Sequence, residues 1–176
     1  MQRLRTANRQ TPRTSRTGLT IVAVGWVALL WGLSTPAWAD AVTDYNLALQ
    51  WYKQGRWELA VEACRDFLKK YPADEHANSA RLYLGQALVH LRDFEGARDE
   101  FRRFLRDAPR HQDRPLAAYR VGESSYFLND LPAAQNELRS FLTTYPKHQL
   151  SPWALLYLGE TEFRLKRVDV ARQLFA

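Results

Sequence analysis

The chain has 176 residues, which fits one domain of ordinary size with enough apolar residues to form a core. Its formal net charge is +6, but five of the 25 basic residues lie in the first 39 residues, which contain no acid. The remainder therefore holds 20 basic and 19 acidic residues. Because phosphate binding needs a dense basic face, this near balance argues against a nucleic-acid-binding protein.

The N-terminal segment predicts export from the cytoplasm. Residues 1–20 are rich in Arg, Thr and Gln, an apolar run follows at 21–33, and a small-x-small pattern ends the segment at Ala37 and Ala39. This order predicts a secretory signal peptide over 1–39, cleaved between Ala39 and Asp40. The alternative is an uncleaved inner-membrane anchor, although the run is shorter than the ~20 apolar residues that a transmembrane helix needs. No cysteine lies near the cleavage site, which excludes lipid attachment there.

From residue 41 the sequence repeats with a period of about 37 residues, which is the signature of a helical solenoid. The period predicts one domain over 40–176, with units at 41–76, 77–113 and 114–150 and an incomplete unit at 151–176. The repeated columns are Gly85, Gly122 and Gly159; Ala60, Ala97, Ala134 and Ala171; Phe67, Phe104 and Phe141; and Pro72, Pro109 and Pro146.

Each unit predicts two helices and no strand, because no stretch alternates apolar and polar residues for long enough to form one. Asp93 and Asp130 stand where N-caps are expected, Asp113 and Ser151 precede prolines that open first helices, and the column proline stops each second helix. The predicted helices are 41–53, 57–71, 77–91, 94–108, 115–128, 131–144, 152–165 and 168 onward.

Small residues predict where the paired helices cross. Glycine midway along the first helix and the column alanine of the second helix are expected to face each other and to allow a close approach. Cys64 occupies the core position held by Phe101, Leu138 and Phe175 in the other units. We therefore expect a buried thiol without reactivity, and a single cysteine excludes an intramolecular disulfide.

These spacings resemble the tetratricopeptide repeat (TPR) family, whose usual unit has 34 residues. The residues that carry the resemblance are Gly85, Ala97, Phe101 and Pro109, and again Gly122, Ala134, Leu138 and Pro146. The chain departs from the family where Arg81 and Ala118 replace the aromatic near the start of the first helix. The resemblance implies an all-α, right-handed superhelical solenoid of helix-turn-helix units.

The Phe-Leu-x-x-Tyr-Pro endings at 67–72 and 141–146 are similar to those of exported bacterial TPR proteins. Examples are the Tol-Pal-associated cell-division coordinator, which usually has a coiled coil before its repeats, and BamD-like outer-membrane assembly lipoproteins. The resemblance implies a protein-protein interaction scaffold in the periplasm, within the cell envelope. Two alternatives are an anchored assembly factor that faces the periplasm and a TPR fragment of a longer protein.

Catalytic chemistry is not indicated. The histidines, His76, His90, His111 and His148, form no metal-binding motif, and neither a cysteine pair nor a glycine-rich phosphate loop is present. Most carboxylates stand beside Arg or Lys and are expected on a solvent-facing helix surface. The sequence therefore predicts no enzyme, cofactor, metal or small-molecule substrate.

The TPR resemblance implies a concave groove, lined by the first helices, that binds a protein or peptide. The alternative is that several of these side chains pack between helices, with Tyr119 and Tyr126 expected to be the most exposed. The implied groove residues are Tyr45, Leu49, Tyr52, Leu82, Gln86, Val89, His90, Tyr119, Glu123, Tyr126, Phe127, Trp153, Leu156, Glu160 and Phe163. The repeated Lys, Arg and Asn of the family's carboxylate clamp are not evident.

The last helix stops short of its Phe-Leu-x-x-Tyr-Pro finish, so that Phe175 is expected to lack a following unit that covers it. Solenoids need polar capping repeats at their ends. We therefore expect further repeats or self-association at the C-terminal end.

Overall fold

The structure is a computed structural model that describes residues 37–175. Most of the predicted signal peptide lies outside these residues. The described part contains eight helices and no strand, as predicted. The helices are α1 (Ala37–Lys53), α2 (Trp57–Lys70), α3 (Ala77–His90), α4 (Phe94–Asp107), α5 (Arg114–Phe127), α6 (Leu131–Thr144), α7 (Ser151–Arg164) and α8 (Val168–Phe175).

From α2 to α7 the observed helix bounds agree with the predicted ones to within one residue. The exception is α1, which begins at Ala37, four residues before the predicted start. The predicted cleavage bond between Ala39 and Asp40 therefore lies in the first turn of α1, and cleavage itself stays a prediction. Among the described helices, none combines the length and the hydropathy that crossing a bilayer requires.

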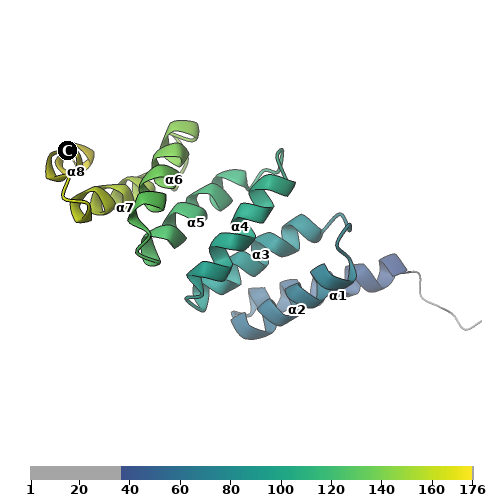
Figure 1. Cartoon of the computed structure of the whole chain (residues 1–176). Helices are drawn as coiled ribbons and strands as arrows, with labels where there is room; N and C mark the ends of the chain where they lie inside the picture. Colours follow the sequence, from purple (N-terminus) through teal and green to yellow (C-terminus); the bar gives the residue numbers. More distant parts are fainter. Residues whose placement is uncertain (1–36, 176) are drawn as a thin grey trace, which may run out of the picture. The chain divides into compact units, whose positions relative to one another are not determined.

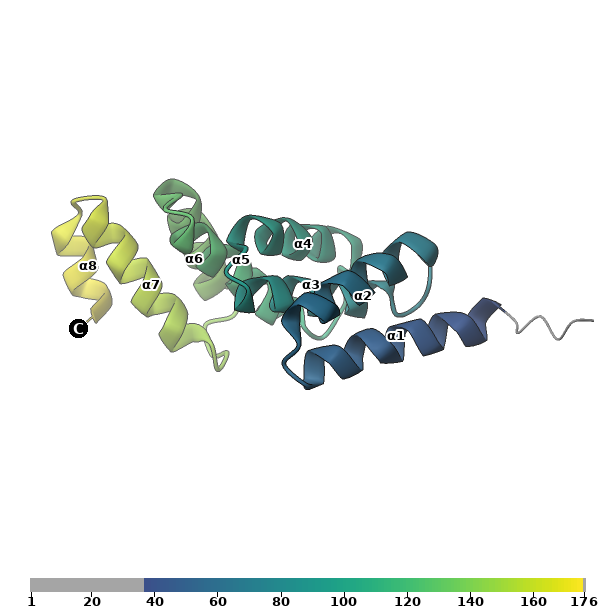
Figure 2. The same ribbon diagram turned by 90° about the horizontal axis from the view of Figure 1, so that it is seen from below.

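The helices form four consecutive hairpins, α1–α2, α3–α4, α5–α6 and α7–α8 (Figures 1 and 2). Each second helix also packs on the first helix of the next hairpin, and the first helices touch directly in the pairs α1–α3 and α5–α7. Among the described residues, each hairpin packs on the hairpins next to it in the chain, and this nearest-neighbour packing of repeated units defines a solenoid.

The glycine column allows the close crossing within each hairpin, but its partner differs from the prediction. A Cβ added to Gly85 would lie 2.8 Å from the Phe101 ring, and one added to Gly122 would lie 2.8 Å from the Leu138 side chain. The bulky core residue of the second helix therefore covers the glycine. The column alanines Ala97 and Ala134 are fully buried beside it.

Two of the second helices, α4 and α6, have the predicted N-cap residues. The Asp93 carboxylate accepts a hydrogen bond from the Gly96 amide at 3.0 Å, and Asp130 accepts one from Ala133 at 3.3 Å. Asp113 precedes α5 without a side-chain capping bond. Ser151 is the first residue of α7 and its hydroxyl donates to the Tyr145 carbonyl at 2.8 Å, which ties α7 to the end of α6.

The turn within each hairpin uses a left-handed residue that the sequence pattern did not reveal. Gly55, Arg92, Asn129 and Lys166 occupy equivalent positions and have φ values of 71°, 62°, 61° and 64°. Glycine adopts this conformation without strain. In Arg and Lys the Cβ atom comes too close to the following carbonyl oxygen, which destabilises the turn.

We expect Arg92→Gly to raise the free energy of unfolding by about 0.5–1 kcal/mol, because glycine removes the Cβ clash at a positive φ. Urea denaturation of the full chain measures this change. Arg92→Ala is the matched control, because it keeps the Cβ and should leave stability nearly unchanged. A glycine variant that is less stable than the alanine variant would contradict this explanation of the turn.

Candidate functional site

The predicted groove residues lie on the four first helices, α1, α3, α5 and α7, and we call them the first-helix face. Their burial varies widely. The buried ones are Leu82, Tyr119 and Glu123; the half-buried ones are Tyr45, Leu49, Tyr52, Gln86, Val89, Tyr126 and Glu160; the exposed ones are His90, Phe127, Trp153, Leu156 and Phe163.

The expectation that Tyr119 is exposed was wrong, since only 3% of its surface is accessible. Its hydroxyl donates to Glu123 at 2.9 Å, and its ring makes an edge contact with Phe141 of α6. Tyr126 is half-buried, because α7 packs beside α5. Part of the first-helix face therefore belongs to the packing between helices, as the alternative interpretation held.

Tyrosines of the first-helix face link neighbouring units. The Tyr52 hydroxyl donates to the Gln86 side-chain carbonyl, 34 residues further on, at 3.1 Å. The Tyr126 hydroxyl donates in the same way to the Glu160 carboxylate, also 34 residues further on. The second unit has Val89 at the tyrosine position, and Glu123 instead accepts hydrogen bonds from Tyr119 and Arg120 of its own helix.

These phenols remain protonated hydrogen-bond donors. Burial raises the pKa of Tyr126 above its ordinary value, and the hydrogen bond to Glu160 raises it further. Burial also raises the pKa of Tyr157, and the nearby charges of Glu123 and Glu160 act in the same direction. Since a higher pKa keeps the phenol neutral at physiological pH, the donor role of Tyr126 is secure over that range.

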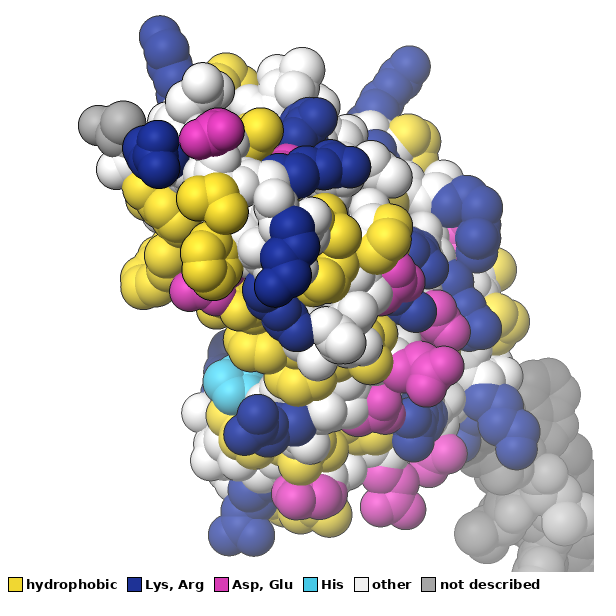
Figure 3. Space-filling view, turned by 60° about the vertical axis from the view of Figure 1, so that its left-hand side comes forward, with side chains coloured by type: hydrophobic (Ala, Val, Ile, Leu, Met, Phe, Trp, Pro, Cys, Tyr) yellow, Lys and Arg dark blue, Asp and Glu magenta, His cyan; other side chains and the backbone are white. Residues whose placement is uncertain are grey.

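The exposed part of the first-helix face is concentrated on α7. Trp153, Leu156, Glu160 and Phe163 lie on one side of this helix, at spacings of three and four residues, and we call them the α7 stripe. Its apolar side chains are 55%, 37% and 60% exposed in sequence order. Figure 3 shows hydrophobic side chains gathered on the side of the molecule that carries α7 and α8.

Aromatic rings adjoin the α7 stripe. Tyr126 lies 4.9 Å from Tyr157 between ring centroids, and Phe127 lies 5.6 Å from Tyr157. Phe94 stacks on Phe127 at 4.6 Å, which fixes the exposed Phe127 ring against α4. These contacts hold Tyr157 of α7 against the aromatic rings of the preceding unit.

Glu160 differs electrostatically from the other carboxylates of the first-helix face. Its contact is the Tyr126 hydroxyl, and no cation of the described residues lies within ion-pair distance of it. Arg164, one helical turn further on, lies over the Tyr126 ring at 5.4 Å and donates to the Asn129 side chain. Glu123, by comparison, is paired with Arg120.

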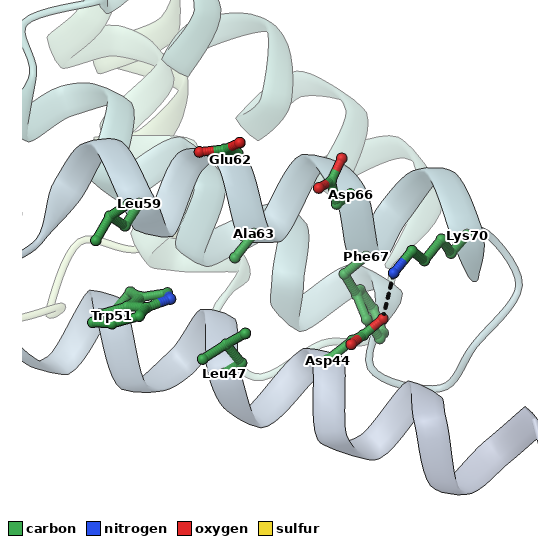
Figure 4. Close-up of a pocket in the computed structure, with 9 residues that line it drawn as sticks. All are labelled: Asp44, Leu47, Trp51, Leu59, Glu62, Ala63, Asp66, Phe67 and Lys70. Atoms are coloured by element: carbon green, nitrogen blue, oxygen red, sulfur yellow. Dashed lines mark hydrogen bonds and ion pairs between the residues drawn. The ribbon is translucent and has the colours of Figure 1, made fainter. Parts of the chain in front are cut away.

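A second concave region lies between α1 and α2, away from the first-helix face (Figure 4). The Lys70 ammonium and the Asp44 carboxylate form an ion pair at 2.9 Å beside the buried Phe67. The remaining lining residues are Leu47, Trp51, Leu59, Glu62, Ala63 and Asp66. Its exposed Leu47 and Leu59 provide controls for experiments on the α7 stripe.

Residues 40–175 contain no cluster of candidate metal ligands and no exposed cysteine. No group of three potential ligands occurs among these residues. His90 stacks on Trp57 at 3.8 Å, and His111 and His148 accept backbone N–H groups two residues further on at 3.2 Å. Cys64 is a buried free thiol, as predicted, and burial raises its pKa to about 12.

Together, the consecutive hairpins and the repeated crossing glycines define a helical-repeat solenoid. The family model described as "Tetratricopeptide repeat" matches residues 45–111 and 119–176, which is most of the chain. The chain therefore belongs to the tetratricopeptide repeat family. No curated protein sequence matches it.

Solved structures with this fold share little sequence with the chain. The apo form of RapI has a TM-score of 0.65 at 15% identity, with 77% of this chain and 40% of RapI covered. A putative kinesin light chain TPR-like repeat protein of Podosopora anserina has a TM-score of 0.63 at 12% identity, with coverages of 84% and 76%. The chain thus spans well under half the length of RapI, and these likenesses establish the fold alone.

A third similar structure contains a bound peptide. The second TPR domain of human RPAP3, in complex with the HSP70 peptide SGPTIEEVD, has a TM-score of 0.59 at 16% identity. The alignment covers 72% of this chain and 98% of the RPAP3 domain.

Proposed function

We propose that this protein is a non-catalytic scaffold that binds a peptide or protein segment in a groove lined by its first helices. TPR proteins generally act as scaffolds for protein-protein interaction, and the structurally similar RPAP3 domain binds a peptide. The observation that carries the proposal is the α7 stripe, which presents three large apolar side chains to solvent on one helix face.

The energetics of the α7 stripe favour a partner. Burying a fully exposed large apolar side chain contributes about 1.5–3 kcal/mol of binding free energy. Trp153, Leu156 and Phe163 are already partly buried, so each contributes a fraction of that amount when a partner covers it. A few large side chains, Trp among the most frequent, dominate the binding energy of an interface when the partner shields them from water. Within the stripe, the Tyr126 hydroxyl holds the Glu160 carboxylate, and Tyr126 itself packs against Phe127 and Tyr157.

The proposed location is the bacterial periplasm, after export by the N-terminal leader. The leader sequence and the near-neutral charge of the remaining chain support this proposal, and the resemblance to Tol-Pal-associated and BamD-like proteins agrees with it. An inner-membrane-anchored protein that faces the periplasm is the second candidate. N-terminal sequencing of the fractionated protein separates them, because a start at Asp40 requires cleavage and a longer product requires an anchor.

We expect Trp153→Ala/Phe163→Ala to reduce the recovery of protein partners at least tenfold in a crosslinking pull-down from the producing cells, because the substitution removes two aromatic anchors. Leu47→Ala/Leu59→Ala is the matched control, since it removes two exposed apolar side chains from the other concave region. Equal recovery with wild type and the α7 variant would reject the proposed binding face.

A further inference from the structure

The geometry points to a second ligand site, independent of the proposed function: a cavity between α5 and α6 that accepts an acidic side chain, Asp or Glu, of a peptide. The cavity has a volume of about 360 Å³ and is lined by these two helices and by Leu105 of α4. All its lining residues belong to the second and third units, which have a described unit on either side.

An ion pair joins the two helices of a hairpin at the same place in the first and second units. The Lys70 ammonium lies 2.9 Å from the Asp44 carboxylate in the first unit, beside the concave region of Figure 4. In the second unit the Arg81 guanidinium lies 2.9 Å from the Asp107 carboxylate. These pairs occupy the same two columns of the repeat with opposite polarity, so the columns bring a cation and a carboxylate together in either order.

The third unit has no charge in these two columns. Ala118 and Thr144 occupy them, and both line the cavity. A cation is nevertheless present, because Arg114 lies one helical turn before Ala118 and also lines the cavity. The third unit therefore supplies the basic partner of such a pair without the acidic one.

The charge of Arg114 is not compensated by an acid. Its Nη1 atom donates to the main-chain carbonyls of Leu105 at 2.5 Å and Ala108 at 3.2 Å. Among the described residues, no carboxylate lies within ion-pair distance of it. Because both hydrogen bonds use Nη1, the Nε and Nη2 groups remain available to a carboxylate.

Glu137 also lines the cavity, but its carboxylate is already paired. It accepts hydrogen bonds from Arg102 at 2.6 Å and from the Ser125 hydroxyl at 2.5 Å. Ser125 lies about three turns, roughly 16 Å, beyond Arg114 on α5. The uncompensated charge of the cavity is therefore the positive one of Arg114, which favours an acidic ligand over a basic one.

The other walls suit the stem and the head of an acidic side chain. Ala118 and Val121 give α5 an apolar surface, and the exposed Asn136 and Ser140 of α6 carry side-chain hydrogen-bond donors. A carboxylate between Arg114 and α6 gains charge-assisted hydrogen bonds that a neutral amide cannot make. The cavity therefore selects Asp or Glu over Asn or Gln.

Peptide titration of the full chain, followed by NMR of its backbone amides, tests the inference. The probes are acetylated and amidated alanine pentapeptides with a central Glu or Gln. We expect the Glu peptide to shift the amide signals of Ala118 and Ser140 and to bind about tenfold more tightly than the Gln peptide, because it adds charge-assisted hydrogen bonds. Equal binding of the two peptides, or no saturable shift with either, would reject the site.

Propionate separates a peptide ligand from a free carboxylate. It carries the carboxylate without the peptide, so we expect it to bind more weakly than the Glu peptide. If propionate binds as tightly, the site takes a free carboxylate and the assignment to a peptide is wrong.

Thr144→Asp places a carboxylate of the chain itself where Asp107 lies in the second unit. It should pair with Arg114 and weaken binding of the Glu peptide about tenfold or more. Thr143→Asp is the matched control: both threonines are exposed and donate to the carbonyl four residues earlier, but Thr143 does not line the cavity. Equal binding by these two variants would overturn the inference.

Two further variants locate the bound carboxylate. Arg114→Gln should remove the preference for Glu over Gln, and Arg114→Lys should keep part of it; a preference that survives Arg114→Gln assigns the carboxylate to another cation. Trp153→Ala/Phe163→Ala should leave the titration unchanged, because α7 contributes nothing to the cavity. Loss of binding in that variant alone would place the peptide on the first-helix face instead. Circular dichroism of each variant confirms that the fold is retained.

Discussion

Cys64→Phe is expected to lower the free energy of unfolding by about 3 kcal/mol, at the upper end of what overpacking a core costs. In the second and third units, the residue at the Cys64 position covers a glycine so closely that an added Cβ would lie 2.8 Å from it. The first unit has Ala48 in place of that glycine and Cys64 in place of the bulky residue, and both are buried in one cluster. A phenylalanine at position 64 would therefore meet the Ala48 methyl group.

The second substitution Ala48→Gly should restore part of the stability of Cys64→Phe, because it recreates the glycine-phenylalanine pair of the second unit. By itself Ala48→Gly should cost about 1 kcal/mol or more, since glycine is unfavourable in a helix interior. Guanidinium unfolding of the two single variants and the double variant gives the coupling, which we expect to be about 1–3 kcal/mol. Independent effects of the two substitutions would refute this account of the crossing.

The second large effect concerns Glu162, which is fully buried on α7. Its Oε1 atom accepts hydrogen bonds from Gln135 at 2.7 Å and from Arg139 at 2.5 Å, and Arg167 lies 3.5 Å from Oε2. These contacts join α6 and α7 and the turn that follows α7. The carboxylate therefore depends on two arginines for its compensating charge.

Arg139→Ala/Arg167→Ala should reduce the free energy of unfolding by about 2–3 kcal/mol at neutral pH. Breaking a fully buried pair costs about 3–5 kcal/mol, and the smaller value applies because both arginines are more than half exposed and partly screened by water. Adding Glu162→Leu should recover most of the loss, since Leu88 occupies the equivalent position in the second unit. A thermal melt in which the double arginine variant matches wild type would show that Glu162 does not need these cations.

The repeat explains why the helices were predictable and why part of the site was not. Equivalent residues in several units fix the helix bounds, because each cap, crossing and proline is seen more than once. Burial of Tyr119 was not predictable in the same way, since a column identifies the face of a helix but not how far the neighbouring first helix covers it. The start of α1 at Ala37 was missed because it precedes the first repeat.

Where equivalent positions of the units hold different residue types, the sequence pattern did not predict their structural role. The left-handed turn position holds Gly55, Arg92, Asn129 and Lys166, which have no common property that marks a positive φ. Glu162 shares its column with Trp51, Leu88 and Ser125, so nothing indicated a buried carboxylate there. Most carboxylates were expected on the solvent face, and Glu123 and Glu162 are buried exceptions, because arginine and tyrosine partners compensate their burial.

The central claim is that partner segments bind along the α7 stripe. Its most direct test replaces Phe163 in the full chain with a photocrosslinking amino acid and irradiates the producing cells. Leu59, exposed on α2, is replaced in the same way as the control. We expect a discrete crosslinked product with another protein from position 163 and not from position 59. Equal products from both positions, or a product from position 59 alone, would contradict the claim.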